Sequence, residues 1–489
     1  MFTNRLSNLV SDFSGLISRK SSEERMGFAN ADVLELSTPA ENCSLKYNGN
    51  LEFNQSNIGI PCDDSPPIEL PSSNGQAESE KKKITEWQAA WNVTNAIQGM
   101  FIVSFPYSVL QGGYWAIIAM VLFAYITYYT GKILIECLYE EDSKGIRRRV
   151  RTSYIQLAEE VWGVRYGGKI VQSAQLIELL MTCVLYVMLC GTLLSNAFAK
   201  IKFNLSCWIM LSSMFLLPCA FLQNYRAVAK LSFWNTISHI IINVIIIGYC
   251  LTFIGSWHWD QIQWKIDIYS APVALGLIVF SYTSQIFLPA LEGSMEDRNR
   301  FECMLGWSHG LAAFFKAGFS CIGFLTFGTN TAEVITTNLP ENSFQFWTNM
   351  FLFFKALLSY PLPYFAACDI VQNRFFEIKG DAQMLPSCYA SNGAFKAWAV
   401  FLRLLVVIVT VLFAIYIPHF TLLMGLIGNF TGTMLSFVWP CYFHMCLKGY
   451  SLPKSTIIWE LTIIIIGILF GGLGIYYSGI GLISALKND

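Results

Sequence analysis

Long apolar runs recur along the chain after residue 85, and short polar segments separate them. Several runs approach the roughly 20 residues that a helix needs to cross a bilayer, so the pattern predicts an all-α polytopic membrane protein. The ninth and tenth runs are joined by the short turn IPHF, and a division into nine or ten spans is an alternative. We expect eleven spans, near 87–111, 114–138, 170–197, 206–222, 231–255, 271–290, 305–327, 344–371, 396–417, 419–446 and 456–484.

Two of these runs carry helix breakers near their middle. The first has Gly99 beside Gln98 and a proline at 106, and the sixth has a polar run, SYTSQ, followed by Pro289. In lipid every backbone N–H and C=O needs a partner, so a break is tolerated only where protein covers it or where it lines a cavity. We therefore predict a binding site at the two breaks, although a proline kink that only packs is the alternative for Pro106 alone.

A break frees carbonyls at the end of one half-helix for a cation and amides at the start of the next for a carboxylate, which suits a zwitterionic amino acid. Breaks in corresponding positions indicate inverted repeats, here spans one to five and six to ten, with span eleven as an addition. For the aromatic candidates, plain packing is the alternative. The predicted substrate-binding residues are Gln98, Gly99, Met100, Phe101, Ile102, Ser104, Phe280, Tyr282, Ser284, Tyr186 and Tyr360.

Ionisable groups inside apolar runs are costly and point to function. Glu178 shares one predicted helix face with Gln175 and Thr182, so it is a candidate proton carrier; a structural hydrogen-bond network is the alternative. For Lys316 a second alternative to a proton-coupling role is that its long side chain extends to the end of the helix. Pairing of Lys316 with Glu178 is a further hypothesis. The proton-coupling candidates are Glu178, His239, His309, Lys316 and Lys355.

Composition and charge narrow the function. Hydrophobic residues make up 54% of the 489 positions and charged residues 13%, while a net charge of −1 argues against a nucleic-acid partner. The sequence contains no HExxH, GxSxG or nucleotide-binding loop, so we expect no enzyme activity and no metal. The 14 cysteines fall mostly in apolar runs, and we predict no structural disulfide. CYFHMC (441–446) is interpreted as a membrane-helix end rather than a metal site.

Positive charges predict the orientation. With a cytosolic N-terminus, the cytosolic loops carry KGIRRRVR (144–151) and seven further Lys or Arg positions, whereas the opposite side carries only four lysines. The C-terminus then lies across the membrane, and Asn204 is a glycan acceptor candidate in a non-cytosolic loop. Residues 1–84 are predicted to be a disordered tail that could hold sorting signals or bind membrane-protein partners. Residues 152–168 read as a cytosolic amphipathic helix.

Several stretches, among them NVTNAIQGMFIVSFPYSVLQGG, YIQLAEEVWG, LQNYRAVAKLSFWNTIS and SYPLPYFAACDIVQ, resemble the amino acid/auxin permease family over about residues 86–485. The likeness is strongest to its vesicular members. It implies a leucine-transporter-type fold and the loading of GABA and glycine into synaptic vesicles by alternating access, in exchange for lumenal protons. Protons would be the coupling ion, with no cofactor, and a chloride role stays open. The alternatives are a plasma-membrane or lysosomal amino acid symporter and an amino-acid-sensing receptor.

Overall fold

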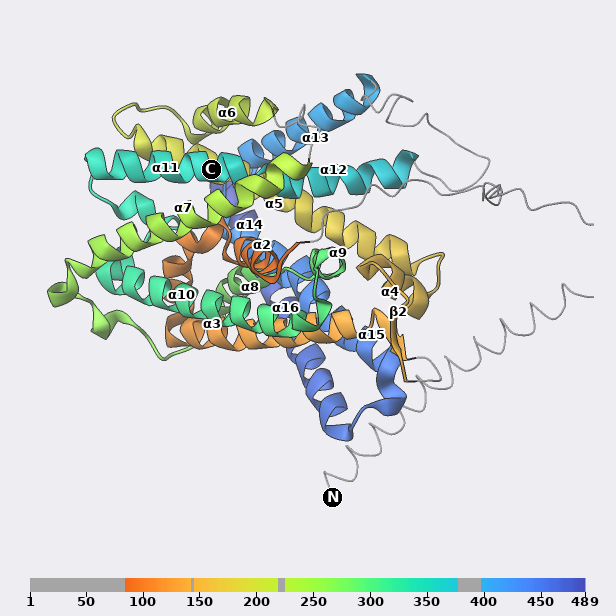
Figure 1. The fold of residues 1–489 in the computed structure, drawn as a ribbon. Coiled ribbons are helices and arrows are strands. Elements are labelled where there is room, and N and C mark those ends of the chain that lie inside the picture. The colour runs from red at the N-terminus through yellow and green to blue at the C-terminus, as the bar shows by residue number, and fades with distance from the viewer. Residues whose placement is uncertain (1–83, 142–144, 219–224, 377–396, 489) are drawn as a thin grey trace, which may run out of the picture. The chain divides into compact units, whose positions relative to one another are not determined.

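The computed structural model describes residues 84–141, 145–218, 225–376 and 397–488, drawn in colour in Figure 1. The expected tail at 1–84 lies outside the described residues except for its last position. The α-helices are α2 (Glu86–Gln98), α3 (Phe105–Glu136), α4 (Tyr154–Trp162), α5 (Gly167–Ala197), α6 (Leu205–Leu216), α7 (Tyr225–Leu251), α8 (Ala271–Tyr282), α9 (Leu288–Ser294), α10 (Phe301–Phe327), α11 (Ser343–Ser359), α12 (Pro361–Phe376), α13 (Ala397–Tyr416), α14 (Phe420–Ile427), α15 (Trp439–Lys448) and α16 (Lys454–Asn488).

Shorter elements complete the described fold. Strands β1 (Tyr139–Glu141) and β2 (Arg147–Arg149) form an antiparallel pair that places acidic residues opposite arginines. Two π-helical segments, Gly428–Gly432 and Met434–Val438, join α14 to α15. The 3-10 turns are η1 (Met100–Ser104), Ile254–Ser256, Trp259–Gln261, Arg298–Arg300, Gly328–Asn330, Ile335–Asn338 and Gly449–Ser451.

Helices lie over every apolar range expected from the sequence. Within the described residues, six helical stretches are long and apolar enough to cross a membrane, and four shorter apolar helices accompany them. The number of crossings and their orientation stay predictions. One expected boundary was wrong. The helix expected at 152–168 ends at Trp162 because Gly163 adopts a left-handed φ of 84°, and α5 begins at Gly167. In the fourth range α6 ends at Leu216, and positions 219–222 of that range lie outside the described residues.

Both predicted breaks are confirmed. Gly99 ends α2 with a φ of 32°, a conformation that disfavours any residue with a Cβ, and η1 follows it directly. In the sixth range α8 ends at Tyr282, and α9 begins only at Leu288 with Pro289 in its first turn. A capping box between Thr85 and Gln88 starts α2 and fixes where the first half-helix begins.

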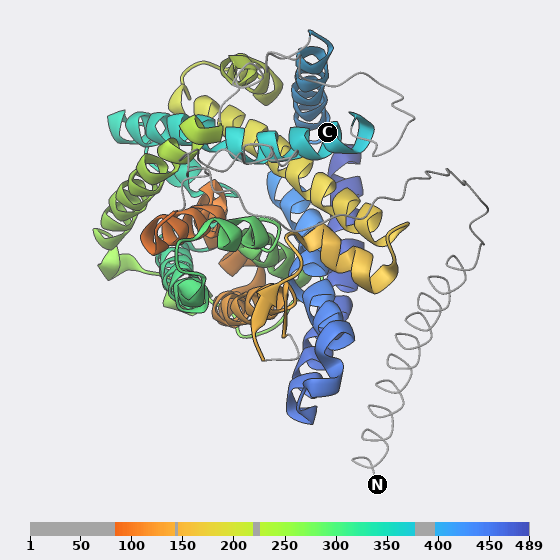
Figure 2. The ribbon, with the colours of Figure 1, turned by 45° about the vertical axis from the view of Figure 1, so that its right-hand side comes forward.

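The helices pack in two groups. The first group contains α2, α3, α8 and α10, and the second contains α5, α6, α11, α12 and α13. Figures 1 and 2 both show α10 running alongside α3. The helix α7 contacts members of both groups, and α14, α16 and the first π-helical segment pack against α8. The two broken segments therefore belong to the same group and face the second one.

Small residues allow α16 to approach the π-helical segments closely. Gly467 and Gly471, in the sequence GILFGG, both pack against Thr433. Asn429 lies between two glycines, because a Cβ added to Gly276 or to Gly474 would come within 2.2 Å of its side chain. Its amide nitrogen also donates to the backbone oxygen of Pro272 at 3.1 Å. Asn429 is thus held on both sides and cannot move aside.

The CYFHMC sequence lies inside α15, as the helix-end interpretation requires. The Nδ1 atom of His444 lies 2.6 Å from the Oε1 atom of Glu460 on α16, and the hydroxyl of Tyr129 on α3 donates to the same oxygen at 2.9 Å. This buried cluster joins three helices, so its polar groups have a packing role.

The contact between Gly474 and Asn429 gives a matched stability test. We expect Gly474→Ala to lower the apparent Tm of the purified protein, because overpacking a filled site costs about 1–3 kcal/mol. Gly472→Ala, on the same helix with nothing within 4 Å of the added Cβ, is the control and leaves the Tm near the wild-type value. Equal Tm values for the two variants would contradict the close packing described above.

Candidate functional site

A cavity lies where the two breaks meet the second helix group. Its walls come from α2, η1, α5, α8, the turn before α9, and the junction of α11 and α12. The lining residues are Asn95, Ala96, Ile97, Gly99, Phe101, Ile102, Glu178, Leu179, Thr182, Tyr186, Phe280, Ser281, Thr283, Ile286, Phe287, Ser359, Leu362 and Pro363.

Aromatic rings form one wall of this cavity. The ring centre of Phe101 lies 5.0 Å from that of Tyr186, 5.4 Å from that of Phe280 and 6.0 Å from that of Phe420. Phe420, at the start of α14, does not line the cavity and packs against Phe101. Because all four side chains are nearly buried, they exclude water from this end of the site.

Glu178 is the acidic group of the cavity, and its side chain is 4% exposed. Its carboxyl group is hydrogen-bonded to the hydroxyl of Thr431, in the first π-helical segment. The same hydroxyl lies 3.2 Å from the backbone oxygen of Ile427. A hydroxyl has one proton to donate and can also accept. The contact therefore accommodates both forms of Glu178: a carboxylate accepts from Thr431, and a carboxylic acid donates to Thr431 while Thr431 donates to Ile427.

Lys316 on α10 is fully buried beside the sixth-range break. Its Nζ atom donates to the backbone oxygen of Ser281 at 2.9 Å and to the Ser281 hydroxyl at 3.0 Å, and it lies 3.5 Å from the ring centre of Tyr282. An ammonium group here faces the negative end of the α8 dipole and a π-electron cloud. The expectation that Lys316 extends to a helix end is wrong, and its contacts are with α8 rather than with Glu178.

A second buried lysine, Lys355, lies among polar side chains between α7 and α11. The Nζ atom of Lys355 lies 2.5 Å from Nδ1 of His239, whose Nε2 atom lies 3.0 Å from the amide of Asn243. One turn earlier on α7, Asn235 donates to the hydroxyl of Ser359, which lines the cavity. The polar side chains at 235, 239 and 243 of α7 are thus buried beside α11, and the histidine among them is hydrogen-bonded.

The cavity brings together six of the predicted residues, and the others lie around it. The lining includes Gly99, Phe101, Ile102, Tyr186, Phe280 and Glu178. The predicted residues that do not line it are Met100, Ser104, Tyr282, Ser284, Tyr360, His239, His309, Lys316 and Lys355. His309 makes a 3.0 Å contact with Leu305 in its own helix. The side chain of Gln98 lies outside the described part of the chain, and Asn204 is exposed at the N-cap of α6.

Sequence reasoning missed Thr431. The sequence NFTGT, which contains the sequon at Asn429, places polar residues between glycines in an apolar run. That pattern marks a helix that approaches its neighbours closely and brings hydroxyl groups with it. The asparagine is 2% exposed, so the useful residue of this motif is its threonine, not its glycan acceptor.

Comparison with known proteins decides the family. The family model described as transmembrane amino acid transporter protein matches residues 82–484. The chain belongs to the transmembrane amino acid transporter family. Its relatives in that family include the vesicular inhibitory amino acid transporter of Xenopus laevis, which is 42% identical and aligns over 95% of this chain and 91% of its own length.

Two further relatives agree with this assignment. The vesicular inhibitory amino acid transporter of Homo sapiens is 41% identical, over 96% of this family member and 92% of the relative. The vesicular GABA transporter of Caenorhabditis elegans is 43% identical, over 87% and 85% of the two chains. A substrate-bound, outward-open Na⁺-coupled sialic acid symporter is similar in fold, with a TM-score of 0.50 and 10% identity over 84% of this chain and 93% of that one.

Cysteine labelling tests the position of the site in this family member. We expect Ala96→Cys, at the cavity wall, to react with a small thiol reagent and to be protected when a small amino acid is present at high concentration. Val103→Cys, which is 1% exposed and does not line the cavity, is the control and stays unreactive. The exposed native Cys207 and Cys303 are replaced beforehand. Labelling of Ala96→Cys that no amino acid slows would contradict the placement of the site.

Proposed function

We propose that this protein loads small zwitterionic amino acids, GABA and glycine, into synaptic vesicles in exchange for lumenal protons. The observation that carries the proposal is the cavity at two helix breaks, with Glu178 in its wall. The family assignment supports an amino acid substrate, and the names of the similar proteins support GABA and a vesicular location.

The substrate has complementary groups in this cavity. The carbonyl end of α2 and the Glu178 carboxyl suit the ammonium group of an amino acid, and the backbone amides that begin η1 suit its carboxylate. The aromatic wall of Phe101, Tyr186 and Phe280 presents an apolar surface that suits a short methylene chain. This wall offers no charged group that could pair with a basic or acidic substrate side chain.

Glu178 supplies the proton-coupling step of the proposal. When its carboxyl carries a proton, it no longer attracts the ammonium group of the substrate, so proton and substrate compete for the site. Thr431 can partner the acid and the carboxylate alike, so neither form leaves a buried polar group without a hydrogen bond. Such competition is what an exchanger requires.

The transport cycle we propose is alternating access. The group of α2, α3, α8 and α10 would rock against the group of α5, α6, α11, α12 and α13, with the cavity between them. Each unit of pH difference supplies about 1.4 kcal/mol per proton, and each 100 mV supplies about 2.3 kcal/mol per charge moved. The excess of Lys and Arg on one side supports a cytosolic N-terminus and a lumenal C-terminus.

Reconstitution of the purified protein tests the proposal. Proteoliposomes with imposed pH and voltage gradients would be given labelled GABA, glycine and alanine in turn. We expect uptake of GABA and glycine when the interior is acidic, and counterflow of labelled substrate when no gradient is present. A sensing receptor would bind these ligands without counterflow, and uptake that ignores internal acidity would contradict proton exchange.

A single substitution tests the role of Glu178. We expect Glu178→Gln to lower acid-driven uptake at least roughly tenfold, which corresponds to about 1.4 kcal/mol, because the amide cannot exchange a proton. Glu302→Gln is the matched control, since this carboxylate is exposed and pairs with Lys132 away from the cavity. Wild-type acid-driven uptake in Glu178→Gln would remove Glu178 from the proton pathway.

A further inference from the structure

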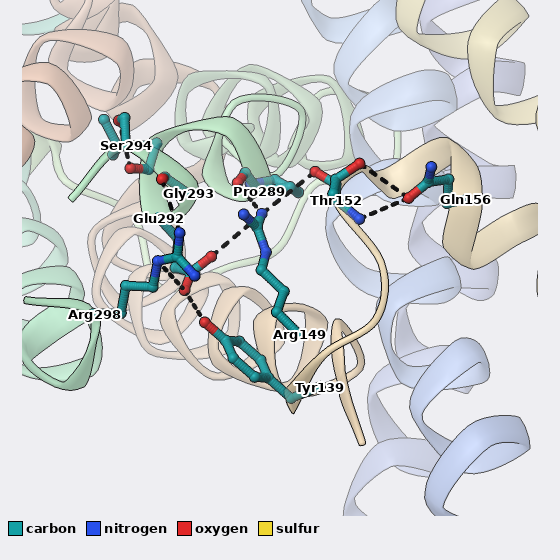
Figure 3. Close-up of polar contacts among 10 residues, drawn as sticks. Tyr139, Arg149, Thr152, Gln156, Pro289, Glu292, Gly293, Ser294 and Arg298 are labelled. Carbon is teal, nitrogen blue, oxygen red and sulfur yellow. Dashed lines mark hydrogen bonds and ion pairs between the residues drawn. The ribbon is translucent and has the colours of Figure 1, made fainter. Parts of the chain in front are cut away.

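A buried carboxylate holds together the segments that lie beside the second half of the broken sixth range. Glu292 on α9 is 1% exposed, and the hydroxyl of Tyr139 on β1 donates to it. Arg149 on β2 approaches it at 3.3 Å, and Arg298 at 3.8 Å. Burial and the hydrogen bond to Glu292 raise the pKa of Tyr139, so this phenol keeps its proton and remains a donor. Figure 3 shows these groups converging on Glu292.

Arg149 links this carboxylate to a different part of the fold. Its Nη2 atom donates to the backbone oxygen of Pro289 on α9 at 2.7 Å and to that of Thr152 at 3.4 Å. Thr152 lies two residues before α4, and α4 packs against α5 of the second helix group. One guanidinium therefore joins α9, which belongs to the moving group in the proposed cycle, to the start of a helix on the other group (Figure 3).

Thr152 is an exposed hydroxyl at the end of an arginine-rich run. Arginines occupy positions 147, 148, 149 and 151, immediately before it in the chain. The Thr152 hydroxyl contacts only the Oε1 atom of Gln156, at 3.0 Å, among the described side chains. The residue thus combines accessibility, a nucleophilic oxygen and a local excess of positive charge, and the transport site does not use it.

We propose that Thr152 is a phosphorylation site, and that its phosphate draws Arg149 away from Glu292 and Pro289. The modifying partner is a cytosolic protein kinase whose acidic pocket reads the exposed arginines four and five residues before the acceptor. In the reaction the Thr152 hydroxyl oxygen attacks the γ-phosphorus of ATP. The new P–O bond forms as the bond to ADP breaks, and the hydroxyl proton passes to the catalytic base of the kinase.

Electrostatic attraction favours the movement of Arg149 from Glu292 to a phosphate on Thr152. A phosphate carries a charge of about −1.5 to −2 and three strong acceptor oxygens, against one negative charge on Glu292. It also forms a two-point contact with a guanidinium, and Arg149 already reaches the backbone of Thr152. Losing Arg149 leaves Glu292 with Tyr139 and Arg298, and frees the backbone oxygen of Pro289 at the start of α9. The half-helix that follows the break then becomes less firmly attached to β2 and α4.

The cytosolic position of Thr152 rests on the proposed function, so the first test does not use transport. Sealed vesicles with this loop facing outward would receive labelled ATP and a kinase that prefers arginines at the two stated positions. We expect label on the peptide containing Thr152, at least tenfold less label in Thr152→Ala, and normal label in Thr152→Ser. Equal label in wild type and Thr152→Ala, or no label on wild type even after detergent opens the vesicles, would overturn the proposal.

The second test asks whether the phosphate releases α9. Backbone hydrogen exchange of residues 286–295 would be compared with and without kinase treatment. We expect at least twofold faster exchange after phosphorylation of the wild type, and no change in kinase-treated Thr152→Ala. In Glu292→Gln, whose neutral amide competes less for Arg149, treatment should add little. Unchanged exchange in the phosphorylated wild type would refute the release of Arg149. If phosphorylation speeds exchange in α9 but the reconstituted protein takes up no amino acid, the proposed function would be wrong and the phosphorylation proposal would stand.

Discussion

Backbone hydrogen bonding in a non-aqueous setting is the constraint on which this structure depends. A helix that stops inside an apolar run exposes carbonyls at one end and amides at the other, and each needs a partner. Gly99 stops one such helix and the turn at 283–287 separates two others, so both sets of groups meet at one place. At the carbonyl end of α8, the side chain of Lys316 donates a hydrogen bond to the backbone oxygen of Ser281. Residues at the end of α2 and the start of η1 line the cavity.

This division explains why the buried charges are separated. A lysine paired with Glu178 would neutralise the acid and take up the room that a substrate ammonium needs. Lys316 instead contacts Ser281, and Lys355 contacts His239. Glu178 keeps a hydroxyl partner in Thr431, which does not commit it to either protonation form. The site therefore retains one acidic group for exchange, and both buried lysines lie outside its lining.

The breaks were predictable from sequence because glycine, proline and consecutive polar residues interrupt an apolar helix locally. Gly99, Phe101 and Phe280 were found in this way, Glu178 was found as an ionisable group in an apolar run, and all four line the cavity. Partners across helices were not predictable. Periodicity places a side chain on a face but does not say which helix lies opposite, so Thr431 was missed and the pairing of Lys316 with Glu178 was wrong. The end of α4 at Gly163 depends on one left-handed residue, which a periodic pattern overlooks.

The wide turns before α15 have a consequence for how Thr431 can move. A π-helical turn holds more residues than an α-helical one and is found mostly as short bulges at functional sites. If the bulge passes along the chain by one position, the residues it crosses turn by about 100° around the axis while both ends of the segment stay in place. Gly428–Gly432 and Met434–Val438 give this segment such slack next to Glu178. Thr431 can thus leave or rejoin the acid when the residues after Asn429 rotate, while Asn429 itself stays clasped between Gly276 and Gly474.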